Sequence, residues 1–282
     1  MKLCVGCVVG ALAACGWSPD PLDGAMCAPP VLDAPWLDEL VIDTVNQLSA
    51  SPRATPSERD AARAALMTEL SSIGLEPQLH SYATGANVVA TIPATTGAAA
   101  GVIVGAHFDT VSQSPGANDN ATGVAVILAV ARYVRDMPCR SAPVTIVLFD
   151  EEERGLVGSR AFALTRTPQT VGAVHTIDQV GWDADGDRRF EIEQPTPALE
   201  QQYREAASAL GLEISVTSVG ATDHQAFRDA GFAAVGITEE FTSADTSPHR
   251  HLVSDTAPTV DVAYVALAAQ LVGQVILREV TP

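Results

Sequence analysis

The chain has 282 residues, of which 47% are hydrophobic, and its formal net charge is −18. This length and hydrophobic content allow a sizeable core, in one large domain or two small ones. An acidic surface repels nucleic acid and anionic lipid head groups, so the charge excludes nucleic-acid binding and electrostatic attachment to a membrane.

The first residues predict an export signal. One lysine precedes an apolar run over residues 3–14, which is too short to span a bilayer and is typical of a secretory signal peptide. The run ends in LAAC at residues 12–15, which resembles the lipobox of bacterial lipoproteins and implies cleavage before Cys15 and acylation of its thiol. An ordinary signal peptide with an incidental Cys15 is the alternative.

We therefore expect a signal peptide over residues 1–14, a proline-rich lipid-anchored tether over residues 15–35, and a single catalytic domain over residues 36–282. The protein would be exported and held by lipid in the cell envelope, at the outer membrane or the periplasmic face, or else secreted. In such an oxidising compartment Cys27 and Cys139 are free to form a disulfide, but the sequence leaves open whether they meet.

Along the domain, helical and strand-like patterns alternate. Helical spacing and capping signals predict helices over residues 36–48, 55–73, 123–135, 197–210 and 260–278. Apolar runs predict strands over residues 87–92, 101–106, 144–149, 173–177 and 233–237. This alternation indicates an α/β fold: a three-layer sandwich whose mixed, mostly parallel central sheet is flanked by helices. Polar residues interrupt the apolar last helix, so we expect it to pack against the sheet rather than to enter a membrane.

Polar residues follow four of the expected strands at their carboxyl ends. They are His107 and Asp109, the acidic run 150–153, Asp178, and Glu239 and Glu240 with His249 and His251 beyond them. Each alone is an ordinary loop residue, but sites in α/β sheets form beyond these strand ends, so the side chains should converge. A divalent cation would balance such crowded carboxylates. Imidazole and carboxylate ligands without thiolate suit zinc, with manganese or cobalt as alternatives.

At these positions the chain resembles peptidase family M28, the zinc aminopeptidase-type exopeptidases. The resemblance covers roughly residues 55–275, and it rests on five motifs in the order of the family: GAHFDT, GANDNATG, FDEEERGLVGS, IDQVGWD and HRHLVSDT. One such motif would be weak, whereas five in order are specific. The resemblance implies a zinc exopeptidase fold, two Zn²⁺ ions per chain and peptide substrates with a free N-terminus.

The resemblance also implies roles for the residues in these motifs. Asp119 would bridge the two metal ions. His107 and Asp178 would complete the ligands of one ion, and Glu153 and His251 those of the other. The sequence Gly-Leu-any-Gly-Ser that follows the glutamate run sets its register.

In that register Glu152 is the general base and Glu153 the ligand, while Glu151 lies outside the pair and its replacement should be nearly silent. His251 is favoured over the nearby His249 because it stands four residues before the Asp-Thr pair of the last motif.

Three residues are expected to support the ligands. Asp109 would hydrogen-bond the far nitrogen of the His107 imidazole and fix its tautomer. Asn120 would follow a cis peptide bond after Asp119. Asp223 would support the ligands or position the substrate.

The α-amine of the substrate would bind a metal ion or an acidic residue such as Glu239 or Glu240. Two other functions remain compatible with the motifs. Glutaminyl cyclases are similar to the family but use one zinc ion; they typically have a small residue after the bridging aspartate and a tryptophan before the last histidine, where this chain has Asn120 and Arg250. The other is a surface lipoprotein that keeps the fold without catalysis, although such relatives usually lose ligands. The sequence does not separate an aminopeptidase from a carboxypeptidase or a dipeptidase.

Overall fold

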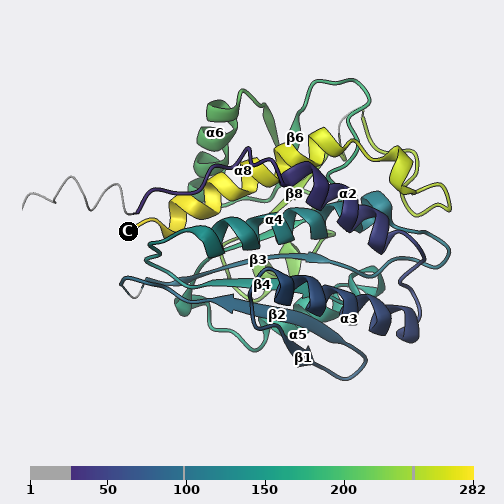
Figure 1. Ribbon diagram of the computed structural model, residues 1–282, viewed down its shortest axis with the longest axis horizontal. Coiled ribbons are helices and arrows are strands. Elements are labelled where there is room, and N and C mark those ends of the chain that lie inside the picture. The colour runs from purple at the N-terminus through teal and green to yellow at the C-terminus, as the bar shows by residue number, and fades with distance from the viewer. Residues whose placement is uncertain (1–26, 98, 243–244) are drawn as a thin grey trace, which may run out of the picture.

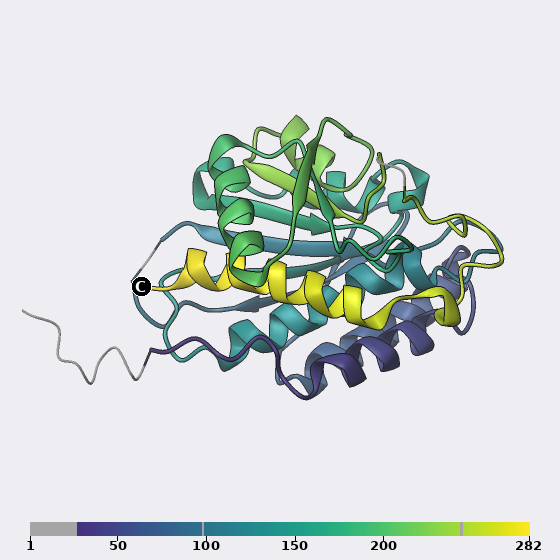
Figure 2. The same ribbon diagram turned by 90° about the horizontal axis from the view of Figure 1, so that it is seen from above.

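The computed structural model describes residues 27–97, 99–242 and 245–282. The expected signal peptide, the lipobox with Cys15 and the first part of the expected tether lie outside the described residues. The described chain forms three layers, in which helices cover both faces of a central sheet (Figures 1 and 2). The expected α/β sandwich is confirmed.

The sheet has eight strands in the order β1-β2-β4-β3-β5-β8-β6-β7. Their bounds are Gln78–Ser81 (β1), Ala86–Ile92 (β2), Gly101–His107 (β3), Val144–Phe149 (β4), Val171–Ile177 (β5), Phe190–Glu193 (β6), Ile214–Thr217 (β7) and Ala234–Thr238 (β8). The four central strands β4, β3, β5 and β8 run parallel, whereas β1 and β2 pair antiparallel at one edge and β6 is antiparallel to β8. The carboxyl ends of the central strands therefore meet at one edge of the sheet.

The helices divide unequally between the two faces. One face carries α2 (Leu37–Leu48), α3 (Pro56–Ser72), α4 (Gly123–Asp136), α6 (Pro197–Leu210) and α8 (Val262–Val280). The other carries the short helices α5 (Val157–Ala163) and α7 (His224–Asp229). Strand β3 contributes Val102 and Val104 to the larger core and Ile103 to the smaller one, so both of its faces are buried. Burial on both faces explains why the sequence of β3 is an unbroken apolar run up to His107.

Helix α8 is long and apolar enough to cross a membrane, with a mean hydropathy of 1.3, but 61% of that apolar window is buried within the structure. It packs against α4, α2 and α6. Asp261 caps its first turn by accepting a hydrogen bond from the amide of Tyr264 at 3.1 Å. The expectation that this helix packs inside the fold is confirmed.

The start of the described chain is fastened to the domain. Cys27 and Cys139 form a disulfide, which joins segments 112 residues apart. Leu32 accepts a hydrogen bond through its carbonyl from the hydroxyl of Tyr133, and the Trp36 ring lies 5.1 Å from that of Tyr133. The pairing that the sequence left open is thus present, and the last residues of the expected tether pack on α4.

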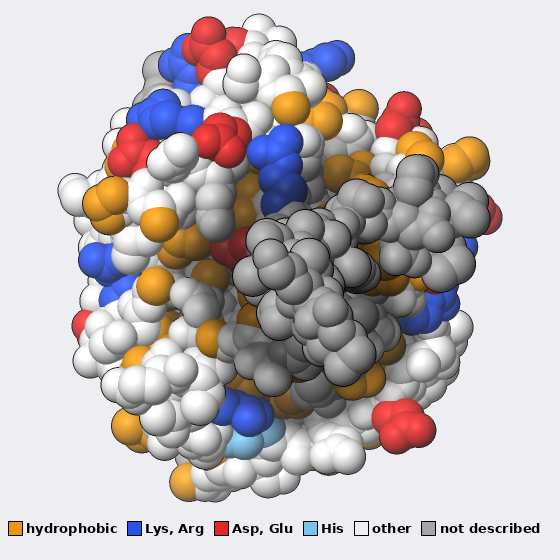
Figure 3. All heavy atoms as spheres, turned by 90° about the vertical axis from the view of Figure 1, so that its left-hand side faces the viewer, with side chains coloured by type: hydrophobic (Ala, Val, Ile, Leu, Met, Phe, Trp, Pro, Cys, Tyr) orange, Lys and Arg blue, Asp and Glu red, His pale blue; other side chains and the backbone are white. Residues whose placement is uncertain are grey.

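The end of the molecule where the chain terminates is shown in Figure 3. Acidic and basic side chains are dispersed there among uncharged ones. The loops that follow the parallel strands lie at the opposite end, at the right of Figures 1 and 2.

Candidate active site

Three of the four central strands deliver polar side chains to the same edge of the sheet. His107 is the last residue of β3, Glu152 and Glu153 lie just beyond β4, and Asp178 directly follows β5. Asp119 lies in the irregular turn that leads into α4, and His251 comes from the long loop between β8 and α8. The parallel arrangement of the strands brings together His107 and His251, which are 144 positions apart in the sequence.

Two groups of potential metal ligands share Asp119. In one group, Nε2 of His107 lies 3.3 Å from Oδ1 of Asp119 and 3.3 Å from Oδ1 of Asp178. In the other, Nε2 of His251 lies 3.2 Å from Oδ2 of Asp119 and 3.2 Å from Oε2 of Glu153. Within each group the ligand atoms lie within 4.8 Å of one another, so each group can hold a metal ion. The structure thus brings together all five residues expected to bind metal.

The donor set fits zinc. Two imidazoles and three carboxylates, with no thiolate, are ligands that zinc accepts in catalytic sites. Nε2 of His251 makes no well-directed hydrogen bond within the described part of the chain, although it lies beside two carboxylates. Such an arrangement suits atoms that point at a common ion rather than at one another.

The pKa values of the two histidines in the metal-free site also indicate that the cluster needs positive charge. At His107 burial acts to lower the pKa, but the carboxylates of Asp178 and Glu152 outweigh it and hold the pKa well above its usual value. The adjacent carboxylates of Asp119 and Glu153, each 3.2 Å from Nε2, raise the pKa of His251 to about 9. Protons therefore supply the positive charge that this acidic cluster needs when no cation is bound.

The expected general base lies at the edge of these groups. Burial raises the pKa of the Glu152 carboxyl well above its usual range, and Asp178 and Asp223 raise it further. Its backbone is held in place because Asp109 accepts hydrogen bonds from the amides of Glu152 at 2.9 Å and Glu153 at 3.2 Å. One carboxylate thus positions the expected base and an expected ligand together.

Asp109 differs in one respect from the expectation. Its carboxylate lies 3.5 Å from Nδ1 of His107, farther than a hydrogen bond, because it is engaged by the two glutamate amides. Nδ1 of His107 instead lies 3.2 Å from the backbone oxygen of Asp109. The imidazole is still oriented by Asp109, through its main chain.

The turn that carries Asp119 is held from several sides. The peptide bond between Asp119 and Asn120 is cis. The Asp255 carboxylate accepts hydrogen bonds from the amides of Asn118 at 2.8 Å and Asp119 at 3.1 Å. Asn120 donates to the carbonyl of Ile177 at 2.8 Å and accepts from the amides of Gly123 and Gln179 at 2.9 and 3.0 Å. Asn120 thus joins the turn to the end of β5.

Three other residues that the sequence suggested for the site lie outside the two metal-binding groups: His249, Asp223 and Glu239. His249 is directed to Ser254, 3.0 Å from its Nδ1, and packs on Trp182, so His251 is the histidine that joins the cluster. Asp223 is buried, and burial raises the pKa of its carboxyl to about 7. Glu239 is buried too.

The Glu239 carboxylate accepts hydrogen bonds from Asn118 and from the amides of Gly181 and Trp182, at distances of 2.8 to 3.1 Å. Most of these hydrogen bonds go to Oε2, and the side chain is fully buried, which makes Glu239 a poor acceptor for the amine of a substrate. The expectation that it could take that amine stays a prediction.

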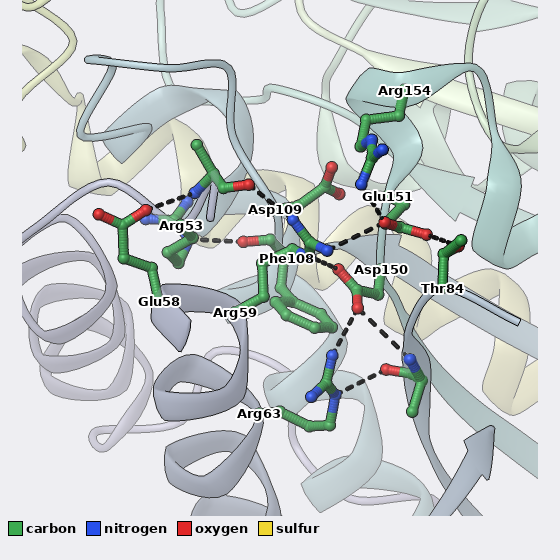
Figure 4. A network of polar contacts seen from close by, with 12 residues as sticks. Arg53, Glu58, Arg59, Arg63, Thr84, Phe108, Asp109, Asp150, Glu151 and Arg154 are labelled. Carbon is green, nitrogen blue, oxygen red and sulfur yellow. Dashed lines mark hydrogen bonds and ion pairs between the residues drawn. The ribbon is translucent and has the colours of Figure 1, made fainter. Parts of the chain in front are cut away.

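Glu151 lies outside the metal-binding groups, as expected, but it is not a solvated residue. It is fully buried and forms an ion pair with Arg59 at 2.9 Å (Figure 4). Arg59 also pairs with Asp150 at 2.8 Å, and Asp150 in turn pairs with Arg63. These residues fasten α3 beneath the loop that carries Glu152. The expectation that replacing Glu151 would be nearly silent in turnover stays a prediction, and the buried ion pair with Arg59 adds an expected cost in stability.

Sequence reasoning missed the part played by Asp255, which fixes the turn of Asp119 from 136 residues away. It also missed Gln179, which follows the expected ligand Asp178 and is buried. Both lie within recognisable motifs, HRHLVSDT and IDQVGWD, so their positions were marked although their contacts were not.

The comparison with curated proteins places aminopeptidases among the relatives. The chain is 28% identical over 187 residues to the aminopeptidase YwaD of Bacillus subtilis. This alignment covers 64% of this chain and 41% of YwaD. Over 68 residues it is 43% identical to the probable lipoprotein aminopeptidase LpqL of Mycobacterium tuberculosis, which covers 24% of this chain and 14% of that protein. The chain thus spans about half or less of the length of these relatives.

Solved structures share the fold. A zinc aminopeptidase from Bacillus subtilis superposes with a TM-score of 0.80 at 15% identity, over 88% of this chain and 96% of that one. A glutaminyl cyclase from Porphyromonas gingivalis superposes with a TM-score of 0.73 at 19% identity, over 86% and 98% of the two chains. The model described as peptidase family M28 matches residues 87–276, which include every residue of the two metal-binding groups. The chain therefore belongs to peptidase family M28.

Proposed function

We propose that this protein is a zinc-dependent aminopeptidase that removes N-terminal residues from peptides and uses two ions held by His107, Asp119, Asp178, Glu153 and His251. The observation that supports it is the position of Asp119, whose two carboxylate oxygens each face a different histidine. The names of the curated relatives support an aminopeptidase, and the sharing of Asp119 supports two ions rather than one.

The chemistry follows from the residues. Zinc held in these groups would activate an attacking water and polarise the scissile carbonyl. Glu152 accepts the proton of that water and delivers it to the leaving amine, and a carboxylate with a raised pKa is suited to this exchange near neutral pH.

We also propose that the protein is exported and anchored by lipid at Cys15. The support is the LAAC sequence after a short apolar run, together with the partial similarity to a probable lipoprotein aminopeptidase. The disulfide between Cys27 and Cys139 suits an oxidising compartment. A protein that is cleaved elsewhere and secreted is the alternative.

The test is a panel of substrates offered to the zinc-loaded full chain. It contains aminoacyl-anilides, the same anilides with an acetylated amine, and peptides that begin with glutamine. We expect hydrolysis of the free-amine anilides, none of the blocked ones, and no cyclisation. Zinc is measured per chain in the same sample, and the Glu152→Gln variant is the control for contaminating peptidases. Cyclisation of glutaminyl peptides, with one zinc ion per chain, would instead identify a glutaminyl cyclase.

A further inference from the structure

A basic side chain, Arg250, lies beside the two metal-binding groups. Its Nε is 3.6 Å from Oδ2 of Asp119, the oxygen that His251 also faces. Among the described residues, no other arginine or lysine lies within 4.0 Å of the carboxylates of the two groups. A guanidinium keeps its charge at any ordinary pH, so Arg250 gives the acidic site a permanent positive charge.

The guanidinium of Arg250 is oriented by the protein but keeps free donors. It lies over the ring of Phe241, 5.1 Å from the ring centre. Its distance from Asp119 is longer than a hydrogen bond, and it makes no hydrogen bond with any residue that the structure describes. The side chain is 41% exposed. Its N–H groups are therefore available to a ligand that arrives from solution.

Arg250 lies on the outer side of the candidate active site. It lines the same small cavity as Glu152 and Asp178, but Glu152 is only 8% exposed and the side chain of Asp178 only 16%. An aminopeptidase takes in the N-terminal residue of its substrate, and the rest of the peptide, whose length varies, must extend towards solvent. A cation on the outer side of the site would meet that leaving part of the peptide.

A guanidinium at this place is suited to a carboxylate. Arginine donates two parallel hydrogen bonds to a carboxylate and is weakly hydrated, which favours such pairs in partly exposed sites. The anionic group that the leaving part of every free peptide carries is its C-terminal carboxylate. In a dipeptide this group lies on the residue directly after the scissile bond, and each further residue moves it away by up to ~3.6 Å. One arginine side chain can therefore reach it only in the shortest peptides.

We propose that Arg250 binds the C-terminal carboxylate of short peptides, so that the enzyme acts best on dipeptides and less well on longer chains. The inference rests on the aminopeptidase function proposed above and names its substrate class. The net charge of −18 repels carboxylates in general, so a preference for one requires a local cation. Bound zinc would neutralise Asp119, the carboxylate beside the guanidinium, and leave Arg250 to pair with the substrate.

Dipeptides and their C-terminal amides form matched pairs, because they share the scissile bond and the free amine. The zinc-loaded full chain is assayed with alanyl-alanine and alanyl-alanine amide, and with alanine tri- and tetrapeptides. We expect the dipeptide to exceed its amide in kcat/KM by about fivefold or more, chiefly through a lower KM, and this advantage to decline in the longer peptides. The amide has the greater positive charge, so general attraction to an acidic protein would give the opposite order.

Two substitutions at Arg250 and one control assign the effect. Arg250→Met should abolish the preference, and Arg250→Lys, which keeps the charge without the planar fork, should keep part of it. Arg204→Met is the matched control, because the Arg204 side chain is 51% exposed and pairs with Glu200 on α6; it should behave as the parent does. Zinc per chain is measured in every variant. Loss of an ion would slow both members of a pair, whereas loss of carboxylate binding slows only the dipeptide.

Binding without turnover separates failure of this inference from failure of the proposed function. Calorimetry measures both ligands with the zinc-loaded Glu152→Gln chain, with and without Arg250→Met. If the dipeptide binds about fivefold more tightly than its amide and Arg250→Met removes the difference, the inference holds even when the parent hydrolyses nothing, and the aminopeptidase function fails alone. Equal or weaker binding of the dipeptide would overturn the inference. So would a preference that persists in Arg250→Met, which is expected if a metal ion binds the carboxylate.

Discussion

The two carboxylate oxygens of Asp119 face different histidines: Oδ1 lies 3.3 Å from Nε2 of His107, and Oδ2 lies 3.2 Å from Nε2 of His251. Each histidine also has a carboxylate partner of its own, Asp178 or Glu153. Asp119 is therefore the element common to both metal-binding groups, and its loss should not resemble the loss of any other ligand.

Asp119→Asn should weaken the binding of both ions, whereas His251→Asn should weaken the binding of one. Loss of a residue that only supports a ligand costs ~10–100-fold in metal affinity, and loss of the shared ligand should cost more. Elemental analysis after dialysis against a weak chelator measures the effect. A parent protein with one zinc ion and full activity would contradict the two-ion arrangement.

Glu152→Gln should keep its zinc and lose turnover by ~10²–10⁴-fold, because glutamine has the size of glutamate but cannot accept the proton. Zinc content and kcat are measured on the same preparation. The substitution should lower kcat and leave the metal affinity unchanged. An inactive variant that has also lost zinc would show that Glu152 is a ligand.

Glu151→Gln should leave kcat of the folded enzyme nearly unchanged but lower the free energy of unfolding by about 1–3 kcal/mol, because a buried charged partner of Arg59 is lost. Urea denaturation measures the change. The control is Glu205→Gln, an exposed partner of Arg278, which should stay within about 0.5 kcal/mol of the parent. If Glu151→Gln abolishes turnover without destabilisation, the register of the glutamate run is shifted by one.

Zinc binding near pH 7 should release protons. In the zinc-free protein the pKa of His251 is raised to about 9 and that of His107 lies well above its usual value, so both imidazoles are protonated at pH 7. Ligand histidines must be neutral, and zinc affinity should therefore fall as the pH falls below these values. Titration calorimetry in two buffers with different ionisation enthalpies counts the protons. Identical apparent enthalpies in both buffers would rule out the release.

The full chain with Cys15→Ser should leave the membrane fraction, or accumulate with its signal uncleaved, because the acidic protein has no other attraction to anionic lipid. Mass spectrometry of the parent's mature N-terminus should show an acylated cysteine. An unmodified Cys15, or cleavage at another position, would identify a plain secreted protein.

The long, periodic elements could be predicted from the sequence, and the short ones could not. The ten expected helices and strands all exist, with ends within two residues of those observed. Strands β1, β6 and β7 have four residues each, and β6 reads FEIE, in which the two glutamates are buried rather than exposed. Their formation depends on neighbouring strands. Helices α5 and α7 are too short to show a period.

The same division holds at the candidate site. Residues carried by compact motifs, such as His107 and Glu152, could be located through the resemblance of those motifs to the family. Contacts between distant segments could not be predicted. Nothing in the local sequence indicates that the Asp255 carboxylate accepts a hydrogen bond from the amide of Asn118, or that Arg59 forms an ion pair with Glu151. The sequence also could not predict that the buried side-chain amide of Gln179 lacks hydrogen-bond partners, because this depends on how distant segments pack around it.

The disulfide between Cys27 and Cys139 sets how far the active site could stand from an anchoring surface. If Cys15 carries lipid as proposed, only the stretch from residue 15 to residue 27 is left to span the gap, at most ~40 Å when fully extended. The described chain begins at the left of Figures 1 and 2, whereas the loops that carry the ligands lie at the right. An enzyme held in this way would keep its substrate entrance turned away from the lipid and towards peptides arriving from solution.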